Sequence, residues 1–375
     1  MTITFCTNFI NHHQAPFADE LYRILGEDFK LVVYMAMPEE FRQSGYPDCD
    51  NERPYVVRYY AGGKDSLSAE ELIRNSDILL WGSFPFELIK KRIKDKKITF
   101  CYSERWFKKR SLNPKYYYSL FNLYTRYRRN PYYLLCASGF LPIEARRLFA
   151  FPGKCFKFGY FPSFEEFDIN AKFQNMNHDI KLFWCSRFIE WKQPLMIPAL
   201  ALYLKEKGYN FTIEMAGGGY MLDDVKKIIE DNELTNQVIL LGNLPNEKIL
   251  EHMRVNDIFL FTSNREEGWG AVLNEAMSCG CAIVASNEIG AVPFLLKNGE
   301  NGVLFDSMNQ FSFNHTVEQL FQDKNKIAHF GNNAYSTIKD VWNPQNAARN
   351  FVKLASNLLD KQECQVENGP CSLCQ

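Results

Sequence analysis

Short apolar runs alternate along this chain with longer segments of helical character. Ten of these runs are predicted to be β-strands, namely Ile3–Phe5, Leu31–Tyr34, Ile78–Trp81, Ile98–Tyr102, Tyr133–Ala137, Ile180–Cys185, Phe211–Met215, Val238–Leu241, Ile258–Phe261 and Ala282–Ala285. Several runs are apolar throughout, which is typical of parallel strands buried on both faces. The intervening segments predict helices, among them Glu70–Ser76, Pro194–Lys207, Asp223–Asn232 and Asn246–Val255. Strand–helix alternation over the whole length predicts two doubly wound α/β domains.

Irregular segments mark the predicted domain boundaries. A charged stretch with little helical character begins near Gly159 and Pro162 and extends to residue 177. It separates an N-terminal domain predicted over 1–160 from a C-terminal domain over 161–342. Asn343 and Pro344 have the order of a helix cap and a first helical residue, which predicts a last helix over 343–360. The polar residues 361–375 are predicted to form a mobile tail.

Composition narrows the class of protein. The net charge of -1 provides no general attraction to nucleic acid, so we expect no nucleic-acid partner. Most of the 11 cysteines stand singly in apolar segments, as reduced thiols of a cytoplasmic protein do. No apolar run is long enough to span a membrane, and the first residues lack the features of a signal peptide. The expected location is therefore the cytoplasm.

A glycine-containing turn follows the predicted strand Ile258–Phe261 and leads into a helix that ends near residue 278. Backbone N–H groups at such a helix start lack partners and carry a partial positive charge. Gly268 and Gly270 would let a ligand approach the backbone closely. The turn therefore predicts a cradle for an anion or polar ligand at the carboxyl edge of a parallel sheet.

Two carboxylates flank this turn. Glu267 lies within it and Glu275 lies eight residues later, in the predicted helix. Paired sugar hydroxyls could donate to both carboxylates, Glu267 holding a hexose and Glu275 a ribose. By themselves, the two acids could equally be a helix N-terminal acid and a surface residue.

The string that contains them carries a family resemblance. Residues 267–306 resemble the nucleotide-sugar-binding region of glycosyltransferase family four. The matching positions are Glu267-Gly268-Trp269-Gly270, Glu275-Ala276-Met277, Gly280, Ile283-Val284-Ala285-Ser286, Gly290-Ala291, Asn298-Gly299 and Gly302. Ala282 stands where the family usually has proline, and Phe294 stands where it usually has glutamate. The resemblance covers the second half of the chain in its motifs and the first half only in architecture.

This resemblance implies the GT-B fold, with two Rossmann-like domains facing a cleft. It implies a donor site in the second domain, an acceptor site mainly in the first, and a last helix, 343–360, that crosses back to the first domain. The segment from Trp184 to Lys192 resembles a further family motif, in which Arg187 and Lys192 would grip the donor diphosphate without a metal ion. Alone, this pair could be two solvated basic residues. The donor-binding residues implied are Gly217, Gly218, Gly219, Asn243, Leu244, Glu267, Gly268, Trp269, Gly270, Ala271, Val272 and Glu275.

Candidates in the first half are less specific. His12 and His13 follow the first predicted strand and could contact the acceptor or the transferring sugar, although a helix-capping or structural role is equally compatible with the sequence. Glu104 follows the predicted strand Ile98–Tyr102, where family members often place a histidine near the donor sugar. It could orient the acceptor hydroxyl or form a surface ion pair with Arg105.

Three basic segments contain aromatic residues or lie beside them: Lys90–Arg92, Trp106–Arg110 and Tyr124–Arg129. Such surfaces suit an anionic membrane interface, where lipid-linked sugars reside, and would make the protein peripheral at the inner face of the cytoplasmic membrane. A solvated basic helix face is the alternative. Cys371 and Cys374 form a CxxC that follows Cys364, but a second CxxC or a nearby histidine is lacking, so four good zinc ligands are not available locally.

The expected activity is transfer of a hexose from a nucleoside-diphosphate sugar, with UDP or GDP as the nucleotide, to a hydroxyl of a sugar or lipid-linked glycan. The resemblance implies retention of anomeric configuration and no cofactor or metal. Two alternatives use the same fold: a sugar-nucleotide epimerase or phosphorylase, and a donor-binding protein without catalysis. A phosphorylase would contain a lysine-bound pyridoxal cofactor, which an absorbance spectrum would reveal.

Overall fold

The computed structural model describes residues 1–39, 49, 53–109, 113–174 and 178–374. Its contacts divide the chain into two compact units, Met1–Ser163 with Val341–Gln375, and Phe164–Asp340. The sequence placed these boundaries at 160/161 and 342/343. Residues 110–112 and 175–177 lie outside the described residues, so Arg110 and the end of the predicted linker have no structural description.

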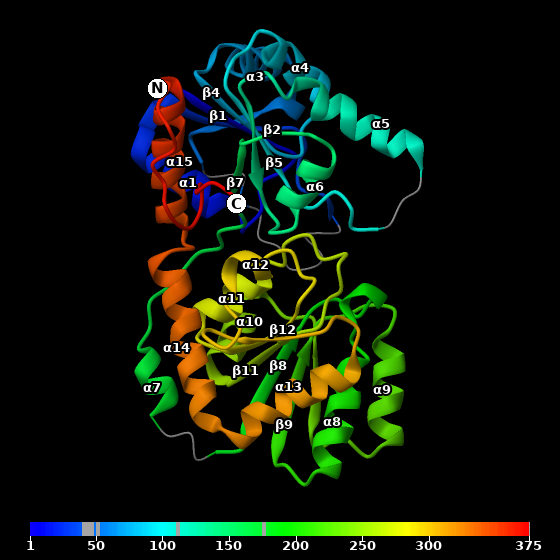
Figure 1. Cartoon of the computed structure of the whole chain (residues 1–375). Coiled ribbons are helices and arrows are strands. Elements are labelled where there is room, and N and C mark those ends of the chain that lie inside the picture. The colour runs from blue at the N-terminus through cyan, green and yellow to red at the C-terminus, as the bar shows by residue number, and fades with distance from the viewer. Residues whose placement is uncertain (40–48, 50–52, 110–112, 175–177, 375) are drawn as a thin grey trace. The chain divides into compact units, whose positions relative to one another are not determined.

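Unit 1 contains a seven-stranded parallel sheet in the order β3-β2-β1-β4-β5-β6-β7. Its strands are β1 (Ile3–Thr7), β2 (Phe29–Val33), β3 (Val56–Arg58), β4 (Ile78–Trp81), β5 (Thr99–Ser103), β6 (Tyr132–Cys136) and β7 (Cys155–Lys157). Its helices are α1 (Ala15–Leu25), α3 (Gly63–Asn75), α4 (Phe86–Lys94), α5 (Pro114–Leu123), α6 (Leu141–Arg147) and α15 (Pro344–Leu359). The order reverses between β1 and β4, as in a doubly wound sheet. Figure 1 shows the helices that flank this sheet.

Unit 2 repeats this topology with the order β10-β9-β8-β11-β12-β13. Its strands are β8 (Ile180–Cys185), β9 (Phe211–Ala216), β10 (Val238–Gly242), β11 (Ile258–Phe261), β12 (Ala282–Ser286) and β13 (Val303–Phe305). Its helices are α7 (Ile169–Phe173), α8 (Met196–Glu206), α9 (Leu222–Asp231), α10 (Asn246–Val255), α11 (Val272–Ser278), α12 (Val292–Leu295), α13 (Gln310–Gln322) and α14 (Lys324–Asp340).

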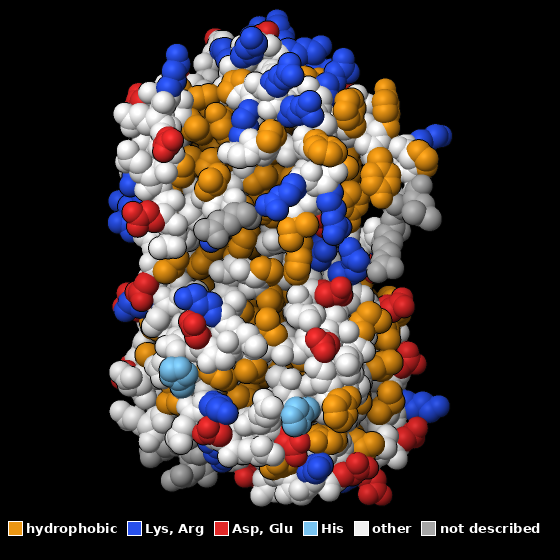
Figure 2. Space-filling view, viewed as in Figure 1, with side chains coloured by type: hydrophobic (Ala, Val, Ile, Leu, Met, Phe, Trp, Pro, Cys, Tyr) orange, Lys and Arg blue, Asp and Glu red, His pale blue; other side chains and the backbone are white. Residues whose placement is uncertain are grey.

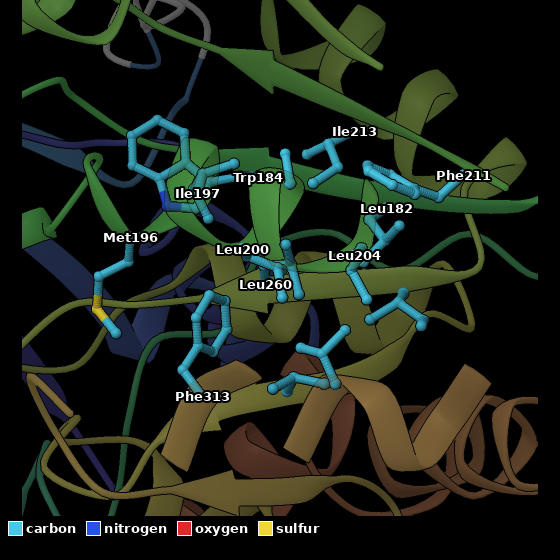
Figure 3. Packing of buried hydrophobic residues seen from close by; sticks show 14 of the residues in the cluster. Leu182, Trp184, Met196, Ile197, Leu200, Leu204, Phe211, Ile213, Leu260 and Phe313 are labelled. Atoms are coloured by element: carbon cyan, nitrogen blue, oxygen red, sulfur yellow. The ribbon is translucent and has the colours of Figure 1, made fainter. Parts of the chain in front are cut away.

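A continuous apolar cluster fixes the central strands of unit 2. Leu182 and Trp184 on β8 pack with Leu200 and Leu204 on α8 and with Phe313 on α13 (Figure 3). All these side chains are buried. Each fully buried side chain of this size contributes about 1.5–3 kcal/mol to the free energy of unfolding. The cluster therefore holds rigid the strand whose carboxyl end carries Arg187 and Lys192.

The last helix begins where the sequence predicted its cap. The Asn343 carboxamide accepts a hydrogen bond from the amide of Asn346 at 2.8 Å, and Pro344 is the first helical residue. α15 then packs on α1 in unit 1, with the rings of Phe17 and Phe351 in edge contact at 6.1 Å.

The prediction of a mobile tail after this helix is wrong for its described end. Phe156 of β7 and Leu373 form an antiparallel bridge, and the Cys371 amide donates to the Lys157 carbonyl at 2.6 Å. Cys371 is fully buried. The tail pairs with β7 because an edge strand presents unpaired backbone groups on its outer side.

Candidate active site

The candidate site lies at the carboxyl ends of β8 and β11, which are adjacent in the middle of the second sheet. The chain leaves β8 toward β9 on one side, and it leaves β11 toward β12 on the other. Ligands of open α/β sheets bind at such a reversal of strand order, beyond the carboxyl ends of the strands. The turns that follow the two strands carry the motifs singled out from the sequence.

Lys192 and Glu267 form an ion pair across these turns. Their side chains are only 11% and 10% exposed, so both charges have lost most of their water. The Lys192 ammonium also lies 4.2 Å from the centroid of the Trp191 ring, and the Arg187 guanidinium carbon lies 5.6 Å from the same centroid. The structure therefore brings Arg187, Lys192 and Glu267 together.

A buried hydrogen-bond chain fixes the position of Lys192. The Trp184 indole N–H donates to the Thr262 hydroxyl at 2.9 Å, and this hydroxyl donates to the Lys192 carbonyl at 2.7 Å. The Asn264 amide donates to the Trp191 carbonyl at 2.9 Å and ties the same turns together. Sequence reasoning missed Thr262, since a threonine after a strand carries no distinctive signal.

Buried side chains pack against the turn that carries Glu267 and fix its conformation. Gly270 has a φ of +90°, and a Cβ there would lie 2.5 Å from the Phe261 ring, so only glycine fits. Trp269 is fully buried, and its indole N–H donates to the Asn274 carboxamide at 2.9 Å. The Trp269 side chain therefore supports the turn, and only its backbone is left for the donor contact predicted from the sequence.

Glu275 extends from α11 toward the end of β8. Its carboxylate accepts a hydrogen bond from the Asn246 carboxamide of α10 at 2.9 Å. Burial raises the pKa of Glu275 to about 7, against the effect of that hydrogen bond. Burial also raises the pKa of the Cys185 thiol to about 12, while the Glu275 charge raises it and the Lys192 charge lowers it. Glu275 and Lys192 thus both flank the end of β8.

The glycine turn after β9 packs on the turn after β8. The Phe188 amide donates to the Gly218 carbonyl at 2.9 Å. A Cβ at Gly217, whose φ is +127°, would lie 1.9 Å from the Ser186 carbonyl oxygen. Close backbone approach thus accounts for Gly217 without a ligand, and the Asn243 carboxamide lies beside Gly218.

Several predicted donor contacts remain predictions. They are those of Gly217, Gly218, Gly219, Asn243, Leu244, Gly268, Ala271 and Val272, which the structure places in the turns after β9, β10 and β11 or at the start of α11.

His12 and His13 lie in the turn between β1 and α1. The Asn11 carboxamide accepts from the amides of His13 at 3.0 Å and Gln14 at 3.1 Å, and the Phe161 amide donates to the His13 carbonyl at 3.0 Å. Burial lowers the pKa of His12 to about 4 and that of His13 well below its ordinary value. Both imidazoles are therefore neutral near pH 7.

A cavity of about 650 Å³ opens in unit 1 at the carboxyl ends of β4 and β5. Eight of its 18 lining residues are aromatic, among them Trp81, Phe84, Trp106, Tyr124 and Tyr160. Glu104 also lines the cavity; its carboxylate accepts from the Tyr160 hydroxyl at 2.9 Å and pairs with Lys108.

The alternative pairing of Glu104 with Arg105 is wrong. Arg105 is buried and pairs with Glu144 at 3.5 Å. Its guanidinium carbon also lies 4.5 Å from the centroid of the Phe140 ring. Glu104 is thereby left on the cavity wall with Lys108 as its cationic partner.

The basic and aromatic segments are only partly at the surface. Arg92 is buried, and its guanidinium donates to the carbonyls of Ser76 and Asp77 at 2.7 and 2.9 Å. Trp106 stacks on Tyr124 with ring centroids 4.4 Å apart, so both belong to the interior. The sequence could not separate these residues from surface ones, because both side-chain types occur in either place.

A group of exposed aromatic residues lies instead on α5, a helix that the sequence analysis did not single out. Tyr117, Tyr118 and Phe121 are 40%, 69% and 50% exposed. Hydrophobic side chains stand at the surface there, with basic side chains nearby (Figures 1 and 2). None of the helices in the described part of the chain combines the length and apolarity that a membrane span needs.

Comparison with known proteins supports the motif assignment. The model of the family Glycosyl transferases group 1 matches residues 166–337. A glycosyltransferase of Methanocaldococcus jannaschii is 28% identical over 197 residues, 52% of this chain and 49% of that protein. The GDP-mannose-dependent alpha-(1-6)-phosphatidylinositol monomannoside mannosyltransferase of Mycolicibacterium smegmatis is 25% identical over 178 residues, 46% of each protein. The chain thus spans about half the length of these curated relatives.

Solved structures extend the similarity to both units. HepE of Anabaena in complex with UDP has a TM-score of 0.70 and 14% identity, covering 95% of this chain and 100% of its own. Sucrose-phosphate synthase of Thermosynechococcus elongatus has a TM-score of 0.68 and 12% identity, covering 96% and 100%. These likenesses show the fold, and they confirm the prediction of the two-domain α/β class named GT-B. The family model in turn confirms the resemblance for the second unit, because it matches residues 166–337, which carry the motifs.

Proposed function

We propose that this protein transfers a hexose from a nucleoside-diphosphate sugar to a hydroxyl of a glycan or lipid-linked glycan, with retention of anomeric configuration. The observation that carries the proposal is the buried Lys192–Glu267 ion pair beside Arg187, at the carboxyl ends of β8 and β11. Charges of both signs in one desolvated place suit a substrate that joins a diphosphate to a polyhydroxylated ring.

Each charged group has a distinct role in the proposed reaction. Lys192 and Arg187 stabilise the negative charge that grows on the departing diphosphate, which removes the need for a metal ion. Glu267 accepts hydrogen bonds from hexose hydroxyls, and Glu275 accepts them from the ribose. The acceptor hydroxyl attacks the face that the diphosphate leaves, and a diphosphate oxygen takes its proton.

The acceptor is assigned to the aromatic cavity of unit 1. Aromatic faces pack against the apolar C–H faces of sugar rings, while Glu104 offers acceptor atoms for their hydroxyls. His12 and His13, which are neutral near pH 7, can each donate or accept a hydrogen bond to the acceptor or to the transferring sugar.

The donor proposal is tested with a panel of UDP- and GDP-sugars, because similar proteins are named for both nucleotides. A true donor should raise Tm by several degrees at about a hundred times its Kd, since ligands stabilise the folded state that binds them. It should also release nucleoside diphosphate when a glycan acceptor is added. If no panel member shifts Tm or is consumed, the proposal fails; binding without consumption would identify a donor-binding protein.

We further propose that the protein works in the cytoplasm, at the inner face of the membrane, and that α5 makes the membrane contact. Its exposed rings Tyr117, Tyr118 and Phe121 can enter the headgroup region. The exposed cations Lys109 and Lys115 lie close in sequence and can face anionic lipids.

The α5 proposal predicts vesicle binding. The protein should sediment with vesicles that contain anionic phospholipid and less with purely zwitterionic ones. Replacing Tyr118 and Phe121 together by alanine should weaken this binding about tenfold or more, because each ring buries apolar surface in the interface. Phe149→Ala, which removes a 74% exposed ring elsewhere in unit 1, is the matched control. Equal binding by the α5 variant and the control would rule out α5 as the contact.

A further inference from the structure

The C-terminal tail lies along the outer side of β7, the edge strand of the first sheet. The Lys157 amide donates to the Ser372 carbonyl at 2.8 Å, and the Cys374 amide donates to the Cys155 carbonyl at 2.8 Å. These bonds define a local antiparallel pairing, in which Cys155 and Cys374 stand opposite each other.

Three thiols meet at this pairing. Opposed residues in a hydrogen-bonded antiparallel pair have Cα atoms about 5.5 Å apart, within the range of about 4.4–6.8 Å that a disulfide spans. The Cys136 thiol, at the end of β6, lies within hydrogen-bonding reach of the thiols of both Cys155 and Cys374. In the described part of the chain, the Sγ atoms of Cys136, Cys155 and Cys374 do not all lie within 4.8 Å of one another. A disulfide needs only two sulfurs to meet, and the opposed backbones of Cys155 and Cys374 let rotation of their side chains bring these two sulfurs together.

A cavity gives solvent access to two of these thiols. Its volume is about 280 Å³, and Cys155, Cys374, Arg128 and Arg146 are among its lining residues. Both arginines are exposed at the surface, so an anionic reagent can approach. Cys136 is fully buried and does not line the cavity.

Cys155 differs electrostatically from the other thiols. The hydrogen bond with Cys136 and the nearby Arg146 charge lower the pKa of the Cys155 thiol, against the opposing effect of burial. Burial instead raises the pKa of Cys101 and Cys279 to about 12. Because the thiolate is the nucleophile, Cys155 is the thiol best suited to react first.

We propose that Cys155 and Cys374 form an oxidative modification site that takes an anionic low-molecular-weight disulfide of the glutathione class. The Cys155 thiolate attacks one sulfur of that disulfide, forming a mixed disulfide and releasing one small thiolate. The deprotonated Cys374 sulfur then attacks Cys155 Sγ, forming the protein disulfide and releasing the second small thiolate. Two protein thiols are oxidised, one small disulfide is reduced to two thiols, and the tail becomes covalently fastened to β7.

The test exposes the reduced full-length chain to glutathione disulfide and maps its peptides without reduction. The wild type should yield a cross-linked Cys155–Cys374 peptide pair, which dithiothreitol separates again. Cys374→Ser should stop at a glutathione adduct on Cys155, and Cys155→Ser should slow the oxidation of Cys374 by about tenfold or more. Cys364→Ser, which alters a half-buried tail thiol outside the cavity lining, should behave as the wild type.

Several results would overturn this assignment. They are a wild-type cross-link from Cys155 to Cys136, oxidation of Cys155→Ser at the wild-type rate, and a glutathione adduct first formed on another cysteine. If a serine variant does not fold, time-resolved alkylation of the native wild type decides: Cys155 should be labelled before the other thiols. The proposal does not depend on glycosyl transfer, because these thiols lie outside the site assigned to that reaction.

Discussion

Replacing Lys192 by alanine should lower kcat/KM for the nucleotide-sugar donor by about a hundredfold to a thousandfold, because a desolvated cation that meets the departing diphosphate is lost. Most of this loss should fall on kcat, since charge on the diphosphate grows as the glycosidic bond breaks. The measurement is steady-state kinetics with the donor that the panel identifies. Glu267→Gln should also lose activity, because its carboxamide presents one acceptor oxygen in place of two.

The control must separate catalysis from folding. Lys192→Ala leaves the Glu267 carboxylate buried without its ion-pair partner, which itself destabilises the fold. Tm and circular dichroism are therefore recorded for each variant. Lys181→Ala removes an exposed lysine from the same strand, β8, and should leave kcat/KM unchanged. A folded Lys192→Ala variant with kcat/KM within threefold of the wild type would falsify the role given to Lys192.

The second large effect is expected from Gly217→Ala, which should lower the free energy of unfolding by about 3 kcal/mol or more. Its φ of +127° is strained for alanine, and the new Cβ would lie 1.9 Å from the Ser186 carbonyl oxygen. That oxygen belongs to the backbone, so relief requires a shift of the turn that carries Arg187. Urea denaturation should show the loss of stability, and kcat/KM should fall as well.

Gly208→Ala is the matched control for this prediction. Gly208 also has a positive φ, +77°, but an added Cβ would meet nothing within 4 Å. Gly208→Ala should therefore lower the free energy of unfolding only by the conformational strain of alanine, about 1–2 kcal/mol. It should leave the activity intact. Equal unfolding midpoints for the two variants would show that the contact with Ser186 relaxes at little cost.

Most of the strand framework followed from the sequence, because a parallel strand buried on both faces reads as a continuous apolar run. The ten predicted strands match observed ones to within two residues at each end. The strands it missed, β3, β7 and β13, are three residues long and lie at sheet edges. Each of these strands is covered on one face only and is three residues long, so it contains too few apolar residues for a pattern to be detected.

The sequence by itself also determined that the donor motifs lie on one turn and the helix that follows it. Glu267, Glu275 and their glycines belong to one contiguous segment, so the pattern of neighbouring residues is enough to predict this turn and helix. Only the tertiary structure decided that Lys192 meets Glu267 and that Thr262 fixes Lys192 to Trp184, since these partners come from different strands and turns. The tertiary structure also decided that Arg92 and Trp106 are buried and that the tail pairs with β7. Periodicity reports which face of one element is apolar, whereas the partner of a polar or aromatic side chain depends on how separate elements pack.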